Sequence, residues 1–194
     1  VMRCWEVGAK TAVGPQGTAF TEMQANLLSR HQAEILEVLL DGDPAGRSAA
    51  LRILPIAMQV GLETSFLELP EGEDPDDLLS KEGLEALEQL RATAKAAMPF
   101  AVTALSKGDA NPRPERRQKI LEEIFEIIFS CSSVSAQEAY LRKASILLNV
   151  SEEAAKQDFR TFRARRIKRK RAHAPDTHEN EKGSQKLTTV EFEL

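Results

Sequence analysis

The sequence contains few of the residues that zinc sites, disulfide frameworks and base-stacking surfaces require. Its 194 residues include two cysteines, three histidines, one tryptophan and one tyrosine. Cys4 and Cys131 lie far apart, and no CxxC pair or Cys/His cluster occurs, so we expect neither a zinc site nor a disulfide framework. A reducing, cytoplasmic setting fits this cysteine usage best.

Long apolar runs and a strong charge imbalance are also missing. No apolar stretch reaches the ~18 residues that span a bilayer, and residues 1–10 lack the apolar core of a signal peptide. The net charge of −4 does not by itself indicate a nucleic-acid-binding protein. Acidic and basic residues are instead segregated along the chain. Neither end reads like a natural terminus, so a piece of a longer protein is expected.

The first part of the chain, to about residue 70, alternates strand and helix signals with short loops. We expect strands at residues 11–14, 34–40 and 64–69, and helices at residues 21–31 and 45–60. The run at 34–40 has the length of a buried strand, although its periodicity does not exclude a helix. This order predicts parallel strands joined by helical crossovers.

The second part is expected to be helical. We expect helices at residues 81–98, 114–130, 134–148 and 151–170, with a hinge at residues 111–114. After residue 171 apolar side chains become scarce, which is typical of a disordered linker. The predicted fold class is therefore α/β followed by all-α, with a parallel sheet and flanking helices preceding a small helical bundle.

The first chemical candidate is the Asp41-Gly42-Asp43 triplet at the end of the second predicted strand. In open α/β sheets ligands bind beyond the carboxyl ends of the strands, and paired carboxylates are hard oxygen ligands suited to Mg²⁺. Magnesium stabilises both the attacking and the leaving oxygen in phosphoryl transfer. The spacing fits equally well a turn that caps the following helix.

A second acidic segment, residues 73–77, follows the next predicted strand. Asp74 is placed as a helix N-cap with proline at the first helical position, which is a sufficient structural explanation by itself. Neighbouring strands lie ~5 Å apart, so the two acidic turns are expected to lie together. That concentration of negative charge is costly unless a cation neutralises it.

A basic run near the end of the last predicted helix is the third candidate. It comprises Arg160, Arg163, Arg165, Arg166, Lys168, Arg169, Lys170 and Arg171. Such a run can contact phosphates without reading sequence, or it can be a solvated helix end favoured by the helix dipole. Only Phe159 and Phe162 interleave with it, so base stacking is poorly supported.

Three segments, in this order and spacing, resemble bacterial DnaG-type DNA primases. They are "PQGTAFTEMQANLL", "LLDGDPAGRSAALR" and "LPEGEDPDDLLSKEG", and "LLNVSEEAAKQDFRTFR" resembles the helix that closes the primase core. The resemblance covers roughly residues 11–166 and implies a Toprim fold. It divides the chain into a partial Toprim α/β domain (1–80), a helical bundle subdomain (81–171) and a disordered linker (172–194) towards a helicase-binding domain.

The resemblance also implies a function and its residues. The family synthesises short RNA primers from NTPs on a single-stranded DNA template, holding an RNA–DNA hybrid, and it binds the replicative helicase through a C-terminal domain. Asp41 and Asp43 match its catalytic metal ligands, Asp74 and Asp76 match the second acidic motif, and the metal is Mg²⁺ or Mn²⁺. Arg47 matches a basic residue suited to a phosphate contact. Location in the cytoplasm, at the bacterial replisome, follows.

The basic helix is the remaining expected nucleic-acid contact, through Arg163, Arg165 and Arg166. The family's Toprim domain begins with a glutamate motif that precedes the first helix, and this sequence lacks it. We therefore expect the isolated chain to be catalytically inert and to bind Mg²⁺ or Mn²⁺ weakly.

Two other function classes stay open. Another Toprim enzyme, a nuclease or a topoisomerase, carries the same acidic triplet. A topoisomerase needs a tyrosine nucleophile, and Tyr140, in an apolar helix, is expected to be buried. A non-catalytic module that binds nucleic acid through the basic helix is the third possibility.

Overall fold

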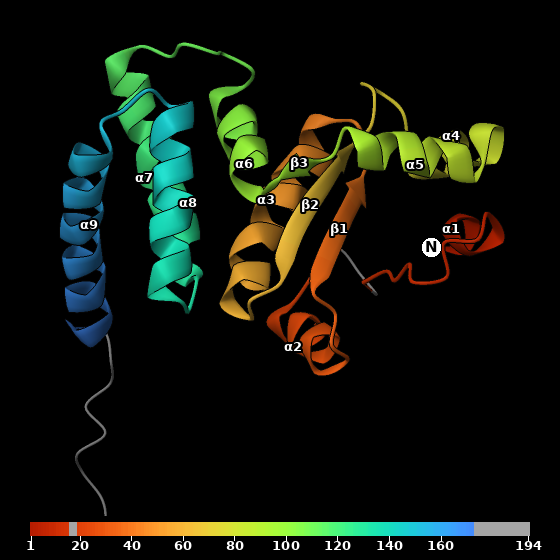
Figure 1. Cartoon of the computed structure of the whole chain (residues 1–194), viewed down its shortest axis with the longest axis horizontal. Coiled ribbons are helices and arrows are strands. Elements are labelled where there is room, and N and C mark those ends of the chain that lie inside the picture. The colour runs from red at the N-terminus through yellow and green to blue at the C-terminus, as the bar shows by residue number, and fades with distance from the viewer. Residues whose placement is uncertain (16–18, 173–194) are drawn as a thin grey trace, which may run out of the picture.

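The computed structural model describes residues 1–15 and 19–172 (Figure 1). The helices are α1 (Met2–Glu6), α2 (Glu22–Arg30), α3 (Pro44–Gln59), α4 (Pro75–Glu82), α5 (Leu84–Ala92), α6 (Ala97–Ser106), α7 (Pro114–Ser130), α8 (Val134–Leu147) and α9 (Glu152–Ala172). The strands are β1 (Ile35–Leu40), β2 (Glu63–Glu68) and β3 (Lys95–Ala96). The predicted linker from residue 173 onward lies outside the described residues.

The sheet has the strand order β1-β2-β3. β1 and β2 are parallel, with Ile35 opposite Glu63 and Leu40 opposite Glu68, and α3 forms the crossover between them. β2 and β3 are antiparallel, with Ser65 opposite Ala96. The prediction of parallel strands joined by a helix is confirmed for β1 and β2, while β3 makes the sheet mixed.

Local sequence explains where the helices that frame β1 begin. Thr21 caps α2, and Gln24 bonds back to the Thr21 backbone, completing the predicted capping box. α3 begins at Pro44, one residue earlier than predicted, because Asp43 is its N-cap and proline suits the first helical position. The glycine that follows its C-cap has φ +79°, a left-handed backbone that ends the helix.

Alternate residues of β1 face opposite layers, because side chains alternate along a strand. Val38 belongs to the main core cluster with α3 residues such as Leu54, whereas Leu39 packs against a smaller cluster formed with α4 and α5. The main cluster continues through Phe100 of α6 into α7, α8 and α9. One hydrophobic core therefore joins the sheet to the helical bundle.

The bundle matches its predicted helices closely. α7 spans the predicted 114–130, and α8 ends one residue early. Figure 1 shows α7, α8 and α9 side by side, with α6 between them and the sheet. The fold class, α/β followed by helices, is thereby confirmed. Within the described part of the chain, no helix is long and apolar enough to cross a membrane.

Two predicted elements are wrong. Residues 11–14 form no strand; they follow α1 as a turn and an irregular segment. The single helix predicted at 81–98 is divided into α4, α5, β3 and the start of α6. Gly83, at φ +67°, ends α4, and Lys95 and Ala96 are pulled into the sheet by pairing with β2. Tertiary pairing overrides the helical pattern there.

Candidate metal and phosphoryl-transfer site

The two acidic turns meet at the carboxyl ends of β1 and β2. The Gly42 backbone N–H donates to the Glu73 carbonyl at 3.0 Å, and the Gly72 N–H donates to the Gly42 carbonyl at 3.2 Å. A side chain at residue 42 is excluded, because a Cβ there would lie 2.0 Å from the Pro70 carbonyl oxygen. Glycine between the two aspartates is thus what allows the loops to touch, and we call this region the acidic edge (residues 41–43 and 70–77).

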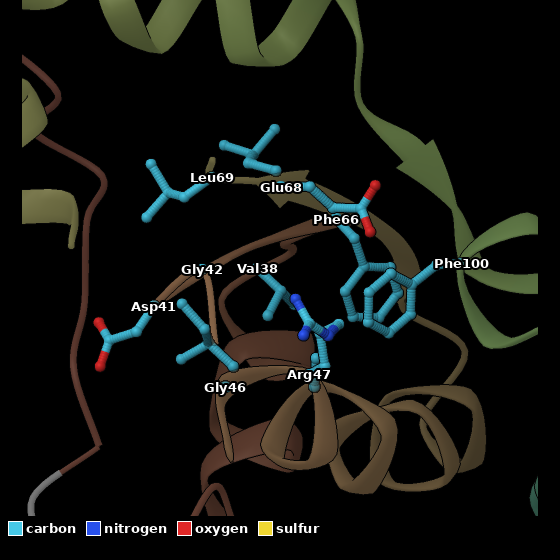
Figure 2. A pocket seen from close by; sticks show the side chains of 12 residues that line it. Val38, Asp41, Gly42, Gly46, Arg47, Phe66, Glu68, Leu69 and Phe100 are labelled. Atoms are coloured by element: carbon cyan, nitrogen blue, oxygen red, sulfur yellow. The ribbon is translucent and has the colours of Figure 1, made fainter. Parts of the chain in front are cut away.

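Asp41 is the most accessible carboxylate of the triplet. It is exposed at the end of β1, and Figure 2 shows its carboxylate pointing away from Arg47 and Glu68. Its carbonyl is crowded by the start of α3, where a Cβ at residue 46 would lie 2.2 Å from the Asp41 oxygen. The backbone that carries Asp41 is therefore tightly held while its side chain faces solvent.

Asp43 and Asp74 act as helix caps. Asp43 Oδ1 accepts from the Gly46 N–H at 2.6 Å, and Asp74 Oδ1 accepts from the Asp77 N–H at 2.9 Å. The capping interpretation of both residues is confirmed. Each cap engages only Oδ1, so a cap and a metal contact through Oδ2 are compatible.

Asp76 is held by a residue that sequence reasoning missed. Arg3 of α1 reaches it with Nε at 3.3 Å from Oδ1 and Nη2 at 3.5 Å from Oδ2, and its Nη1 lies 2.6 Å from Glu6 Oε2. The hydrogen bond that Arg3 donates to Asp76, followed by the negative charge of Asp76, raises the pKa of the Arg3 guanidinium. The 73-residue separation leaves no local signal for this contact.

The two acidic turns share one edge of the sheet without forming a finished metal site. In residues 1–15 and 19–172, no group of three or more His, Cys, Asp or Glu side chains is placed to hold a metal ion. The donors nonetheless suit a hard divalent cation, since the edge offers carboxylate and carbonyl oxygens on two backbone-linked loops. The chemistry of these donors fits Mg²⁺ or Mn²⁺.

Arg47 lines a cavity of about 220 Å³ beside the acidic edge. Its apolar wall includes Phe66 and Phe100, whose rings stack with centroids 3.9 Å apart. Glu68 also lines the cavity and pairs with Lys95 at 2.5 Å. Figure 2 shows Arg47 on the same side as the two rings. The guanidinium is therefore placed next to the acidic edge, on a semi-apolar surface.

The three arginines predicted to contact nucleic acid have different surroundings. Arg166 pairs with Glu126 of α7 at 2.8 Å. Arg165 lines a groove of about 660 Å³ between α7 and α9, which also contains four carboxylates: Glu122, Glu123, Glu126 and Asp158. Arg163 is half-buried. Arg166 is thus engaged in an ion pair within the bundle, whereas Arg165 is exposed beside this groove.

Tyr140 is half-buried in α8, more accessible than predicted. Desolvation by burial raises the pKa of its phenol, with smaller contributions from Cys131 and Glu63. A raised pKa disfavours the phenolate that a tyrosine nucleophile needs.

Comparison with known proteins shows that this chain is similar to Toprim-like proteins and to DNA primases. A family described as Toprim-like matches residues 1–79. The DNA primase of Halalkalibacterium halodurans is 30% identical over 165 residues, covering 84% of this chain and 27% of that protein. The chain spans about a quarter of the length of the curated primases that it matches over most of its own length.

Solved structures agree with the sequence relatives. A DNA primase domain from Pseudomonas aeruginosa superposes with a TM-score of 0.69 at 26% identity, covering 81% of this chain and 50% of that one. A DnaG primase catalytic domain bound to single-stranded DNA superposes with a TM-score of 0.66 at 28% identity, covering 79% and 50%. The resemblance inferred from the sequence motifs is confirmed.

Proposed function

We propose that this chain, which belongs to the DnaG-type DNA primases as a Toprim-containing segment of their catalytic core, carries part of the metal site for RNA primer synthesis. The observation that supports this best is the pair of backbone hydrogen bonds that joins the two acidic turns through Gly42. Without that junction the aspartates of the two turns would belong to separate loops.

The metal ligands in this proposal are Asp41, Asp43, Asp74 and Asp76. Magnesium or manganese, when bound, supplies charge neutralisation for the phosphate oxygens in phosphoryl transfer. Asp43 and Asp74 are held in place by their helix caps, which is the preorganisation that such a site needs. Arg47, beside the same edge, contacts a phosphate of the NTP or primer.

The substrates and partners in this proposal are those expected of a primase. We infer NTPs, a single-stranded DNA template and an RNA–DNA hybrid as ligands, and a replicative helicase as a partner through a C-terminal domain. The solved relative bound to single-stranded DNA supports the template. Arg163 and Arg165 are the better template contacts on α9, because Arg166 is engaged with Glu126.

The domain division in this proposal is a partial Toprim domain at 1–80 and a helical bundle subdomain at 81–171; the linker predicted at 172–194 lies, apart from Ala172 at the end of α9, outside the described residues. We further propose that the isolated chain is inert in primer synthesis, as its sequence leads us to expect. Primer synthesis above the level of an Asp41→Asn, Asp43→Asn double variant, with labelled NTPs on a single-stranded template, contradicts this.

A Toprim nuclease is the alternative that shares the acidic edge. A metal-dependent nicking assay on supercoiled DNA separates it from the primase assignment, since nicking that disappears in the double variant favours the nuclease. A topoisomerase is disfavoured by the half-buried Tyr140 and the raised pKa of its phenol.

The metal site is tested by titrating Mn²⁺ into the full chain and following the electron paramagnetic resonance signal of free Mn²⁺. Asp41→Asn and Asp43→Asn are each expected to weaken binding about tenfold, the loss of one charged ligand. Asparagine keeps the N-cap, so folding is preserved at residue 43. Asp158→Asn, on α9, is the matched control, and an equal loss in that variant refutes a site at the acidic edge.

A further inference from the structure

α1 contacts α4 through apolar packing, to which Cys4 contributes, and through one charged side chain, Arg3. It packs against α4, and Figure 1 shows it next to that helix, away from the bundle. Arg3 donates to both carboxylate oxygens of Asp76 on α4 and also to Glu6 on its own helix. The guanidinium thus lies between two carboxylates, one of which is a proposed metal ligand.

A guanidinium and a divalent cation compete for the same carboxylate oxygens, because each stabilises the same negative charge. Both oxygens of Asp76 face Arg3, at 3.3 and 3.5 Å, so a metal that binds Asp76 competes with the guanidinium for the same charge and weakens the pair. The pair is solvent-exposed, with Asp76 at 67% side-chain exposure, and exposed pairs are weak enough to exchange.

We propose that Arg3 is an internal counter-cation for Asp76, and that divalent metal binding at the acidic edge weakens this ion pair and so loosens the contact of α1 with α4. This inference rests on the proposed metal function of the acidic edge. Arg3 is a positioning residue in it, since it acts on the metal through Asp76.

Glu6 makes the weakening of this ion pair easy to reverse. Its Oε2 lies 2.6 Å from Arg3 Nη1, so after Asp76 turns to the metal the guanidinium keeps a partner on its own helix. If Glu6 is removed, Arg3 no longer divides its hydrogen bonds between Glu6 and Asp76. Its interaction with Asp76 is then expected to become stronger. Arg3 and Glu6 substitutions are therefore expected to change metal affinity in opposite directions.

The single tryptophan reports on the same event. Trp5 lies on α1, 48% exposed, with its Nε1 donating to the Ala12 carbonyl at 2.9 Å and the Lys10 ammonium 5.5 Å from its ring centroid. By linkage, if the α1–α4 contact opposes metal binding, metal binding opposes the contact equally. Trp5 emission is therefore expected to change as Mg²⁺ binds.

The experiment compares Mn²⁺ affinity by electron paramagnetic resonance in variants of the full chain. Arg3→Gln is expected to tighten Mn²⁺ binding about twofold to fivefold, as fits an exposed ion pair. Glu6→Gln is expected to weaken it about twofold. Arg30→Gln, which removes one positive charge from α2 instead, is the control for net charge. Its Mn²⁺ affinity is expected to equal that of the parent chain.

Fluorescence of Trp5 during a Mg²⁺ titration provides the second measurement. The parent chain is expected to show a saturable change in emission, and Arg3→Gln a clearly smaller change, because the ion pair with Asp76 is already absent in that variant. Equal Mn²⁺ affinity in the parent chain and Arg3→Gln, with weaker binding in Asp41→Asn, overturns the counter-cation role and leaves the metal site standing. Unchanged Mn²⁺ binding in Asp41→Asn overturns the metal site itself.

Discussion

The acidic edge of the sheet and the helical bundle treat charge in opposite ways. In the bundle, charged side chains form ion pairs across helices, Arg166 with Glu126 and Arg142 with Glu152, and also along α9, where Lys156 pairs with Glu152. At the acidic edge, Asp41, Asp43 and Asp74 enter no ion pair with any residue that the structure describes. Paired charges stabilise a scaffold, whereas a concentration of unpaired carboxylates is costly and calls for an external cation.

The two regions nevertheless share one hydrophobic core. Substitutions in this core are expected to have the largest effect on the free energy of unfolding. Leu54 of α3 and Ile124 of α7 are both fully buried in the same cluster. Leu54→Ala and Ile124→Ala are each expected to lower the free energy of unfolding by about 2–5 kcal/mol, the cost of a core cavity. Urea unfolding followed by circular dichroism is expected to show one transition in each variant. Two separate transitions would mean that sheet and bundle unfold independently.

The contact between the two acidic turns gives the next largest effect. Gly42→Ala places a Cβ 2.0 Å from the Pro70 oxygen, so we expect a loss of about 3 kcal/mol from overpacking together with weaker Mn²⁺ binding. Gly61→Ala is the control: its φ of +79° is also strained, but its Cβ would meet nothing within 4 Å. It is expected to cost about 1 kcal/mol and to leave Mn²⁺ binding intact. Equal losses of stability and metal affinity in both variants would remove the special role of Gly42.

The basic residues of α9 provide a test of the bundle that is separate from the test of the acidic edge. Charge reversal at Arg163 and Arg165 is expected to reduce affinity for single-stranded DNA about tenfold at low salt, because each phosphate contact releases counterions. Fluorescence anisotropy with a labelled oligonucleotide measures this. Arg52→Glu on α3 is the control, since Arg52 donates to Ser48 on its own helix. A comparable reduction in Arg52→Glu would indicate non-specific attraction only.

The smallest effect is expected from the ion pair between α7 and α9. Arg166 and Glu126 are 40% and 47% exposed, and exposed pairs contribute about 1 kcal/mol or less. Glu126→Gln is therefore expected to lower the free energy of unfolding by under about 1 kcal/mol in urea. It is also expected to free Arg166 for DNA and so raise affinity slightly. DNA affinity that stays the same in this variant would contradict a contact between the freed Arg166 and DNA.

Local signals in the sequence were enough to predict much of the fold. The capping box of Thr21 and Gln24, the N-caps at Asp43 and Asp74, and the apolar stripes of α7 and α8 each depend on residues a few positions apart. The meeting of the acidic turns was predicted from the order of two strands. These features need no information about distant parts of the chain.

Features that depend on distant contacts were not predicted. β3 is only Lys95–Ala96, too short for any strand pattern, and it exists because it pairs with β2. The contact of Arg3 with Asp76 joins residues 73 positions apart. The pairing of Arg166 likewise depends on how α9 packs on α7. In each case the neighbour, rather than the local sequence, decides the structure.

The central claim is that two turns, separate in sequence, form one cation site. Fe²⁺ in place of Mg²⁺, with ascorbate, cleaves the backbone next to the bound ion, and mass spectrometry identifies the cut positions in the full chain. We expect cuts within both turns of the acidic edge, around Asp41 and around Asp74, and both are expected to disappear together as Mg²⁺ is added. Cuts confined to one turn, or spread along α9, would contradict a shared site.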